Sequence, residues 1–239
     1  KYSRGYGYWC WKPYLILKEL EKLEDKDILL YSDIGCFFNP KGKAKFQEYI
    51  KRTLESETGI LGVRSYEESY NTMPETVYYE HHWTKGDVFE YFGVQEDSEI
   101  THTTQFESTI IFFKKSDFSM KFVRDWYKAY LDDYTLATDS PSRVPNFPGF
   151  VENRHDQSIY SILAKKYNIE AFSTNEIFQR DWNLLEQYPI WAMRDKAYPS
   201  KLHYRMRFRI RKFYAYLWKV KYFFKDMFCG VHDQSIRAK

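Results

Sequence analysis

Hydrophobic residues follow two kinds of spacing along this chain, and the two alternate. Short apolar or β-branched runs predict buried strands at 28–32, 59–63, 105–113 and 168–172. Apolar residues three or four positions apart predict helices over 13–23, 43–57, 84–92, 116–131 and from 155 onward. Because strands and helices alternate, the pattern predicts an α/β sandwich with a mixed, mostly parallel sheet.

Two segments follow neither spacing. Residues 64–81 are polar and aromatic, and residues 135–150 are rich in Pro, Ser, Asn and Gly, so both are expected to form loops. Thr84 and Asp87 have the spacing of a capping box at the start of a helix. Ser116 is placed to cap the long helix that follows it.

The C-terminal part of the chain differs from the rest in composition. The length of 239 residues allows one large domain, or one domain with an appendage. We predict a main domain over residues 1–200 and a basic, aromatic, helical tail over residues 201–239. Such a tail is typical of an element that binds a membrane surface or a partner. The alternative is a terminal helix that packs on the domain and keeps its basic face in solvent.

Composition argues against several classes of protein. The formal net charge of +3 is too small for a general nucleic-acid-binding protein. Three cysteines at unrelated spacings predict neither a disulfide framework nor a zinc site, which favours a reducing compartment. The sequence shows no signal peptide and no apolar run long enough to span a bilayer. We therefore expect a cytoplasmic protein, with peripheral contact to the cytoplasmic membrane face through the tail as an open alternative.

Aromatic residues make up 20% of the chain, more than core packing usually needs. Tyr and Trp combine a stacking face with a polar group, which suits sugars or nucleobases. A large aromatic core is the alternative. Near the N-terminus, Tyr8 and Trp9 lie in a glycine-containing loop between the cations Arg4 and Lys12. This loop is a candidate site for a flat ligand.

Two carboxylates stand where the predicted elements place ligands. Asp33 follows a buried strand, and ligands of open α/β sheets bind at the carboxyl ends of strands; the alternative is that Asp33 caps a turn. Asp156 stands at a helix start between Arg154 and Gln157. A hard divalent cation that holds phosphates would use one or two such carboxylates. The chain has no Walker loop, no Rossmann fingerprint and no nucleophile elbow.

Three motifs in this order resemble a group of bacterial and viral glycosyltransferases with the GT-A fold, which act in surface-polysaccharide synthesis. The motifs are RGYGYW with WKPY at residues 4–14, DILLY with Asp33 and GC at residues 27–36, and RHDQSI at residues 154–159. The resemblance covers about residue 4 to about residue 170. It implies a nucleotide-diphospho-sugar transferase built as an α/β/α sandwich. Such domains usually begin with a strand and a helix that hold the nucleobase, and little precedes Arg4, so we expect part of this half-site to be missing.

The resemblance also implies roles for individual residues. Asp33 matches the first Asp of the Asp-x-Asp motif, which binds the ribose and a Mn²⁺ or Mg²⁺ ion, whereas Gly35 stands in the second position. Asp156 and Gln157 match the segment that lines the acceptor and the reacting carbon. His203 matches a late histidine that ligates the metal. Cations to stabilise the departing diphosphate are available at Arg4, Lys12, Lys85 and Arg154.

Together these observations predict a glycosyltransferase that moves a sugar from a nucleotide-sugar donor, expected to be a UDP-sugar, to a glycan or lipid-linked acceptor. Two alternatives from other classes stay open. One is a non-catalytic relative that binds carbohydrate or nucleotide, which the missing second Asp and the short N-terminus favour. The other is a basic adaptor at a membrane surface, which rests on the tail alone.

Overall fold

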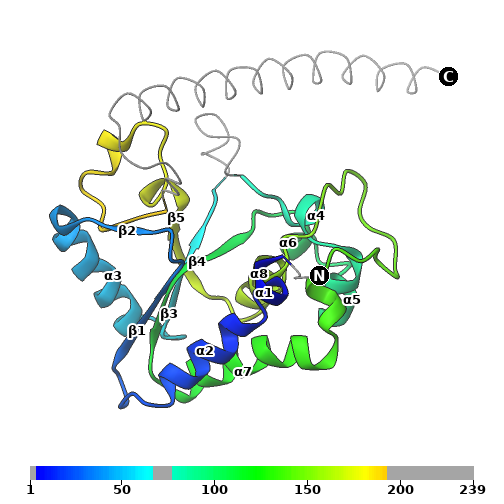
Figure 1. Cartoon of the computed structure of the whole chain (residues 1–239), viewed down its shortest axis with the longest axis horizontal. Helices are drawn as coiled ribbons and strands as arrows, with labels where there is room; N and C mark the ends of the chain where they lie inside the picture. The colour runs from blue at the N-terminus through cyan, green and yellow to red at the C-terminus, as the bar shows by residue number, and fades with distance from the viewer. Residues whose placement is uncertain (1–3, 67–76, 193–239) are drawn as a thin grey trace. The chain divides into compact units, whose positions relative to one another are not determined.

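The computed structural model describes residues 4–66 and 77–192, and these residues build an α/β fold around a mixed sheet (Figure 1). The strand order of the main sheet is β1-β4-β3-β5. Strand β4 pairs antiparallel with both β1 and β3, whereas β3 and β5 pair in parallel. The prediction of a mostly parallel sheet is therefore wrong for the pairing in the described residues. The reason is that β4 runs opposite to its neighbours, although β1, β3 and β5 share one direction.

The bounds of the elements follow chain order. The helices are α1 (Gly5–Tyr8), α2 (Trp11–Leu20), α3 (Lys43–Glu55), α4 (Glu80–Trp83), α5 (Gly86–Phe92), α6 (Ser98–Thr101), α7 (Asp117–Asp132) and α8 (Asp156–Lys166). The strands are β1 (Ile28–Ser32), β2 (Phe37–Phe38), β3 (Ile60–Arg64), β4 (Phe106–Lys114), β5 (Glu170–Ser173) and β6 (Ile190–Trp191). Short 3-10 turns are η1 (Pro40–Gly42), η4 (Tyr134–Ala137), η5 (Thr174–Glu176) and η6 (Trp182–Leu185).

Each face of the main sheet is covered by helices and has its own hydrophobic core. Figure 1 shows α3 on one face and α2 and α7 on the other. On the α3 face, the ring of Tyr49 stacks on Phe172 of β5 with centroids 4.2 Å apart. The opposite core contains the fully buried Leu20, Trp126 and Tyr160 from α2, α7 and α8. The sheet therefore lies between two packed hydrophobic layers.

Strand β4 carries an irregularity at the edge where β1 and β3 end. Leu61 pairs with Phe112 and Val63 pairs with Glu107, so residues 108–111 of β4 lie opposite Gly62 alone. A Cβ on Gly62 would come within 2.8 Å of the Tyr160 hydroxyl, so the close approach requires glycine. Extra residues in one strand redirect its side chains, and such bulges are frequent beside functional sites.

The larger predicted elements are confirmed, whereas several short ones were not predicted. The four predicted strands correspond to β1, β3, β4 and β5, and Ser116 caps α7 by accepting from the Ser119 amide. Helices α4 and α6 and the small β2–β6 sheet were not predicted. The capping box at Thr84 is wrong: α5 begins at Gly86, and the Thr84 hydroxyl donates to Glu80 instead.

The N-terminal aromatic segment, expected to be a loop, forms one left-handed helical turn. All five residues from Gly5 to Trp9 have φ between 52° and 99°. The Tyr8 amide donates to the Arg4 carbonyl at 2.7 Å and the Trp9 amide to Gly5 at 3.2 Å. Left-handed backbone costs about 1–2 kcal/mol for each non-glycine residue. Tyr8 and Trp9 offset this cost by packing on His155, whereas Tyr6 is 87% exposed and lies between the two glycines of the turn.

The described residues contain no helix long and apolar enough to cross a membrane. The predicted tail over 201–239 and its boundary at residue 200 lie outside the described residues.

Candidate functional site

The structure brings three predicted site residues from distant parts of the chain into direct contact. The Lys12 ammonium lies 2.6 Å from Oδ2 of Asp156 and 3.6 Å from Oδ1 of Asp33. The side chains of Lys12 and Asp156 are 2% and 8% exposed, and that of Asp33 is 19% exposed. A buried lysine thus lies between two carboxylates, and one of these carboxylates reaches solvent.

Two residues that were not predicted complete this cluster. Ser108 accepts from the Lys12 ammonium through its hydroxyl (3.1 Å) and its carbonyl (3.0 Å), and its hydroxyl donates to Asp156 at 2.8 Å. Tyr31 donates its hydroxyl to Oδ1 of Asp33 at 2.9 Å, and the Lys12 ammonium lies 5.1 Å from the centre of its ring. Burial and the nearby Asp33 charge raise the pKa of Tyr31, so its hydroxyl remains a donor.

Four elements meet at this cluster. Asp33 follows β1, and its amide donates to the Thr109 carbonyl of β4 at 2.9 Å, which sets Ser108 beside it. Lys12 lies in the first turn of α2, and Asp156 is the first residue of α8. The backbone of these elements therefore places the side chains of Asp33, Lys12 and Asp156 close together.

The left-handed turn packs against the residue that precedes Asp156. The His155 ring lies 5.0 Å from the Tyr8 ring and 5.7 Å from the Trp9 ring. His155 itself has φ 58° and ψ −119°, a strained backbone for a non-glycine residue. Its Nδ1 is 2.8 Å from the Ala137 carbonyl. Tyr8 and Trp9 thus pack on the residue that directly precedes α8.

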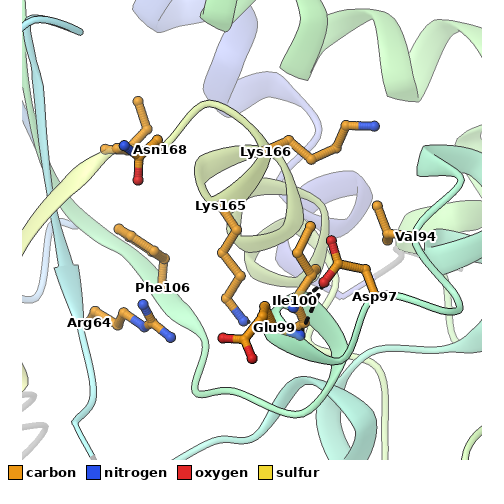
Figure 2. A pocket seen from close by; sticks show the side chains of 10 residues that line it. Arg64, Val94, Asp97, Glu99, Ile100, Phe106, Lys165, Lys166 and Asn168 are labelled. Atoms are coloured by element: carbon orange, nitrogen blue, oxygen red, sulfur yellow. Dashed lines mark hydrogen bonds between the residues drawn. The ribbon is translucent and has the colours of Figure 1, made fainter.

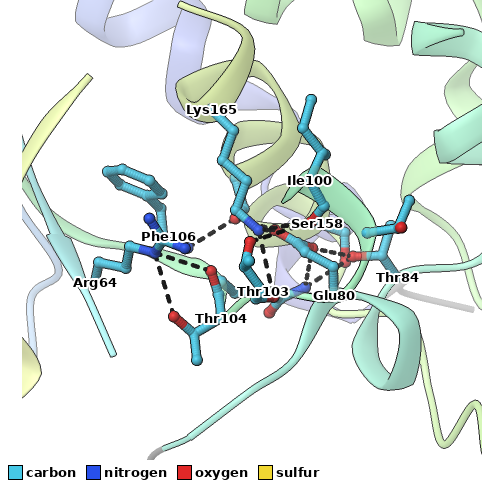
Figure 3. A network of polar contacts seen from close by, with 12 residues as sticks. Arg64, Glu80, Thr84, Ile100, Thr103, Thr104, Phe106, Ser158 and Lys165 are labelled. Atoms are coloured by element: carbon cyan, nitrogen blue, oxygen red, sulfur yellow. Dashed lines mark hydrogen bonds and ion pairs between the residues drawn. The ribbon is translucent and has the colours of Figure 1, made fainter. Parts of the chain in front are cut away.

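Gln157 points into a second buried network, which is centred on Glu80. Figure 3 shows Glu80 in contact with Thr84 and with Lys165, which reaches it from the far end of α8. The carboxylate of Glu80 is fully buried and lies 3.0 Å from the Lys165 ammonium. Gln105 donates to Glu80 at 3.0 Å and accepts from Gln157 at 2.9 Å.

This network fixes the orientation of two amide groups. A charged carboxylate can only accept hydrogen bonds, so Gln105 must turn its NH₂ group toward Glu80. The carbonyl oxygen of Gln105 then faces Gln157, which must donate its own NH₂ group. The side-chain carbonyl of Gln157 is therefore directed away from Gln105. Glu80 was not predicted as part of the site, and a lone Glu between aromatic residues gives no sequence signal for such a role.

Arg154 and Glu107 add a partly exposed cation and a perturbed carboxylate near the strand ends. The Arg154 guanidinium lies 4.3 Å from the ring centre of Tyr78 and 5.0 Å from that of Trp83, and its side chain is 28% exposed. Burial raises the pKa of Glu107; the hydrogen bond from Thr174 and the Arg154 charge oppose this rise, and the Asp33 charge adds to it. Glu107 was not predicted, because its position within a strand pattern resembles that of any outward polar residue.

The remaining predicted residues lie apart from the Lys12 cluster. Lys85 is buried and bonded to the Thr135 carbonyl, with Asp87 at 3.7 Å, so it anchors the loop after α7. Burial lowers the pKa of Lys85. Arg4 is exposed and contributes a backbone carbonyl to the left-handed turn. His203 lies outside the described residues.

A divalent cation does not fit between Asp33 and Asp156 as these residues stand. A Mg²⁺ or Ca²⁺ ion would have to lie about 2.0–2.6 Å from the carboxylate oxygens. The Lys12 ammonium already lies at that distance, 2.6 Å from Oδ2 of Asp156, so it occupies the place of the ion. Within residues 4–66 and 77–192, no group of three His, Cys, Asp or Glu side chains is arranged to hold a metal ion. Gly35, in the second position of the resembled motif, has no side-chain ligand to offer.

A pocket of about 530 Å³ opens at the other end of α8 (Figure 2). Its cations are already engaged by the protein. Lys165 pairs with Glu80, Lys166 donates to the Phe92 carbonyl at 2.7 Å, and Arg64 donates to the Thr104 carbonyl at 3.1 Å. The Lys12 cluster, with its solvent-reaching carboxylate at a strand end, is therefore the stronger candidate for chemistry.

Comparison with known proteins adds no assignment to this geometry. No protein-family model, curated protein or solved structure matches the chain.

Proposed function

We propose that this chain is a glycosyltransferase that uses a nucleotide-sugar donor, with a UDP-sugar as the expected donor and a glycan or lipid-linked molecule as the acceptor. One observation carries the proposal. Lys12, Asp33 and Asp156, which belong to the three resembled motifs, make one ionic cluster at the carboxyl end of β1. Such strand ends are where α/β sheets bind ligands. Turn capping alone would not require a buried lysine to join two carboxylates.

The surrounding groups supply what sugar transfer needs. The reaction passes through an oxocarbenium-like state while a diphosphate departs with negative charge. Arg154, which is partly exposed and contacts Glu152 at 3.3 Å, offers a cation on an aromatic support for that charge. Asp33 offers a carboxylate to a donor or acceptor hydroxyl. Glu107, whose Oε1 accepts from the Thr174 hydroxyl at 2.7 Å and whose pKa is raised by burial, is suited to accept the proton of an acceptor hydroxyl.

The direct test is a binding and hydrolysis screen with the full chain. We expect UDP to bind in calorimetric titration, and one UDP-sugar to be hydrolysed slowly when no acceptor is present. Binding of free sugars without any binding of UDP would favour the non-catalytic relative instead. If neither nucleotides nor sugars bind, the proposed function is wrong.

Replacing Glu107 with Gln is expected to lower turnover by about 10²–10⁴-fold, the usual contribution of a general base. The base must be deprotonated to act, and its pKa lies above the ordinary value of 4.5. Turnover of the unmodified chain should therefore fall as the pH drops through that raised pKa. The pH–rate profile checks this, because the acidic limb should disappear in Glu107→Gln. A profile that keeps the same acidic limb would assign it to another group.

A further inference from the structure

The Lys12 cluster contradicts the metal site that its resemblance implies, and the contradiction has a physical cause. An ammonium group has three N–H donors. Those of Lys12 face three acceptors, namely Oδ2 of Asp156 at 2.6 Å and the hydroxyl and carbonyl oxygens of Ser108 at 3.1 and 3.0 Å. The same oxygens, with Asp33, are the hard ligands that a divalent cation would use.

We propose that Lys12 is the resident cation of this site, and that the two carboxylates take up no divalent cation while Lys12 is present. The bound ligand would then be a nucleoside diphosphate recognised without a bridging metal. The identity of this ligand rests on the proposed function. The exclusion of a divalent cation depends on Lys12, Asp33 and Asp156 alone.

The Lys12 charge is covalently attached to the fold, so it cannot dissociate as a bound ion can. The Lys12 amide donates to the Trp9 carbonyl at 2.9 Å, at the end of the left-handed turn. Trp9 and Tyr8 in turn pack on His155, which precedes Asp156. The left-handed turn, which precedes Lys12, and His155, which precedes Asp156, thus pack together and keep Lys12 beside Asp156.

Charge balance predicts what happens when Lys12 is removed. With Lys12 present, one ammonium faces two carboxylates, and the cluster carries a single net negative charge. Without Lys12, two carboxylates and the oxygens of Ser108 surround the vacated volume with no cation among them. Uncompensated buried charge is strongly unfavourable, so the altered site should recruit a divalent cation from solution.

The experiment is a Mn²⁺ titration of the full chain followed by electron paramagnetic resonance. We expect Lys12→Ala to bind Mn²⁺ at least about tenfold more tightly than the unmodified chain, with a matching rise in Tm on adding Mn²⁺. Adding Asp156→Asn to Lys12→Ala should remove the gain. The matched control is Lys85→Ala, which deletes an equally buried lysine near Asp87 and should bind Mn²⁺ as the unmodified chain does.

Lys12→Met, which keeps the aliphatic stem, replaces Lys12→Ala if the smaller side chain prevents folding. Equal Mn²⁺ affinity in the unmodified chain and the Lys12 variant would overturn the proposal. If the unmodified chain binds Mn²⁺ and Asp33→Asn alone abolishes that binding, the proposal is also overturned, because Asp33 would then hold the metal while Lys12 is present.

A second titration separates this inference from the proposed function. UDP should bind the unmodified chain with the same affinity, within about twofold, in EDTA and in Mn²⁺. UDP binding that requires Mn²⁺ would overturn the metal-free part of the inference. A complete absence of UDP binding would reject the proposed function and with it the named ligand, while the Mn²⁺ titration would still decide whether Lys12 excludes the metal.

Discussion

Replacing Glu80 with Leu is expected to lower the free energy of unfolding by about 3–5 kcal/mol, the usual loss when one partner of a buried ion pair is removed. Glu80 has no solvent exposure and lies 3.0 Å from the Lys165 ammonium, whose side chain is 5% exposed. Its loss would leave Lys165 with the Ile100 carbonyl at 2.9 Å as its nearest remaining acceptor. It would also leave the NH₂ group of Gln105 without its carboxylate. Urea denaturation of the full chain measures the loss.

A double variant distinguishes a buried charge from simple loss of packing. Glu80→Leu combined with Lys165→Met removes both charges, so the pair should be less destabilised than Glu80→Leu alone. As a surface control, Glu152→Ala breaks an exposed contact to Arg154 at 3.3 Å and should change stability by about 1 kcal/mol or less. If the double variant is less stable than Glu80→Leu alone, the loss of stability comes from packing and the ion-pair explanation fails.

The fold was predictable where local pattern and burial agree, and not where pairing is decided at long range. β1, β3 and α7 follow from apolar spacing and from Ser116 as a cap. The antiparallel insertion of β4 between β1 and β3 leaves no trace in hydrophobic periodicity, because a strand buried on both faces looks alike in either direction.

The left-handed turn shows a second limit. Gly5 and Gly7 allow positive φ, but the same conformation at Tyr8 and Trp9 accompanies packing against His155, which is distant in the sequence. A sequence motif of alternating glycines and aromatic residues predicts an irregular segment. Local backbone preference alone does not predict that this segment is a left-handed turn.

The candidate site divides in the same way. Asp33, Lys12 and Asp156 stood out by their motifs, and the structure joins them. Ser108 and Glu107 could not be found, because only the shift in register opposite Gly62 turns β4 toward this edge. Lys85 looked equally suitable as a cation in the sequence, and its burial beside Asp87 places it elsewhere.

Replacing Asp33 with Ala is expected to reduce sugar transfer or donor hydrolysis by about a thousandfold, a loss comparable to that of a key electrostatic contact in a transition state. Asp33 is the carboxylate of the cluster that reaches solvent, with 19% of its side chain exposed. Its removal takes the negative charge from the strand end and leaves the Tyr31 hydroxyl without its acceptor. Turnover of the donor identified in the screen, measured at saturating concentration, checks the prediction.

Two variants tell the charge of Asp33 apart from its structural contacts. Asp33→Asn retains an oxygen that can accept from Tyr31, so it should fold normally and still lose most of the turnover if the charge is what acts. Asp27→Ala is the matched control, because Asp27 stands exposed just before β1, at the opposite end of the strand from Asp33. It should leave turnover within about twofold of the unmodified chain, since solvent screens an exposed charge so far from the site. Full turnover in Asp33→Asn would assign this carboxylate a structural role. Glu107, the proposed general base, would then be the carboxylate at this edge of the sheet that takes part in the reaction.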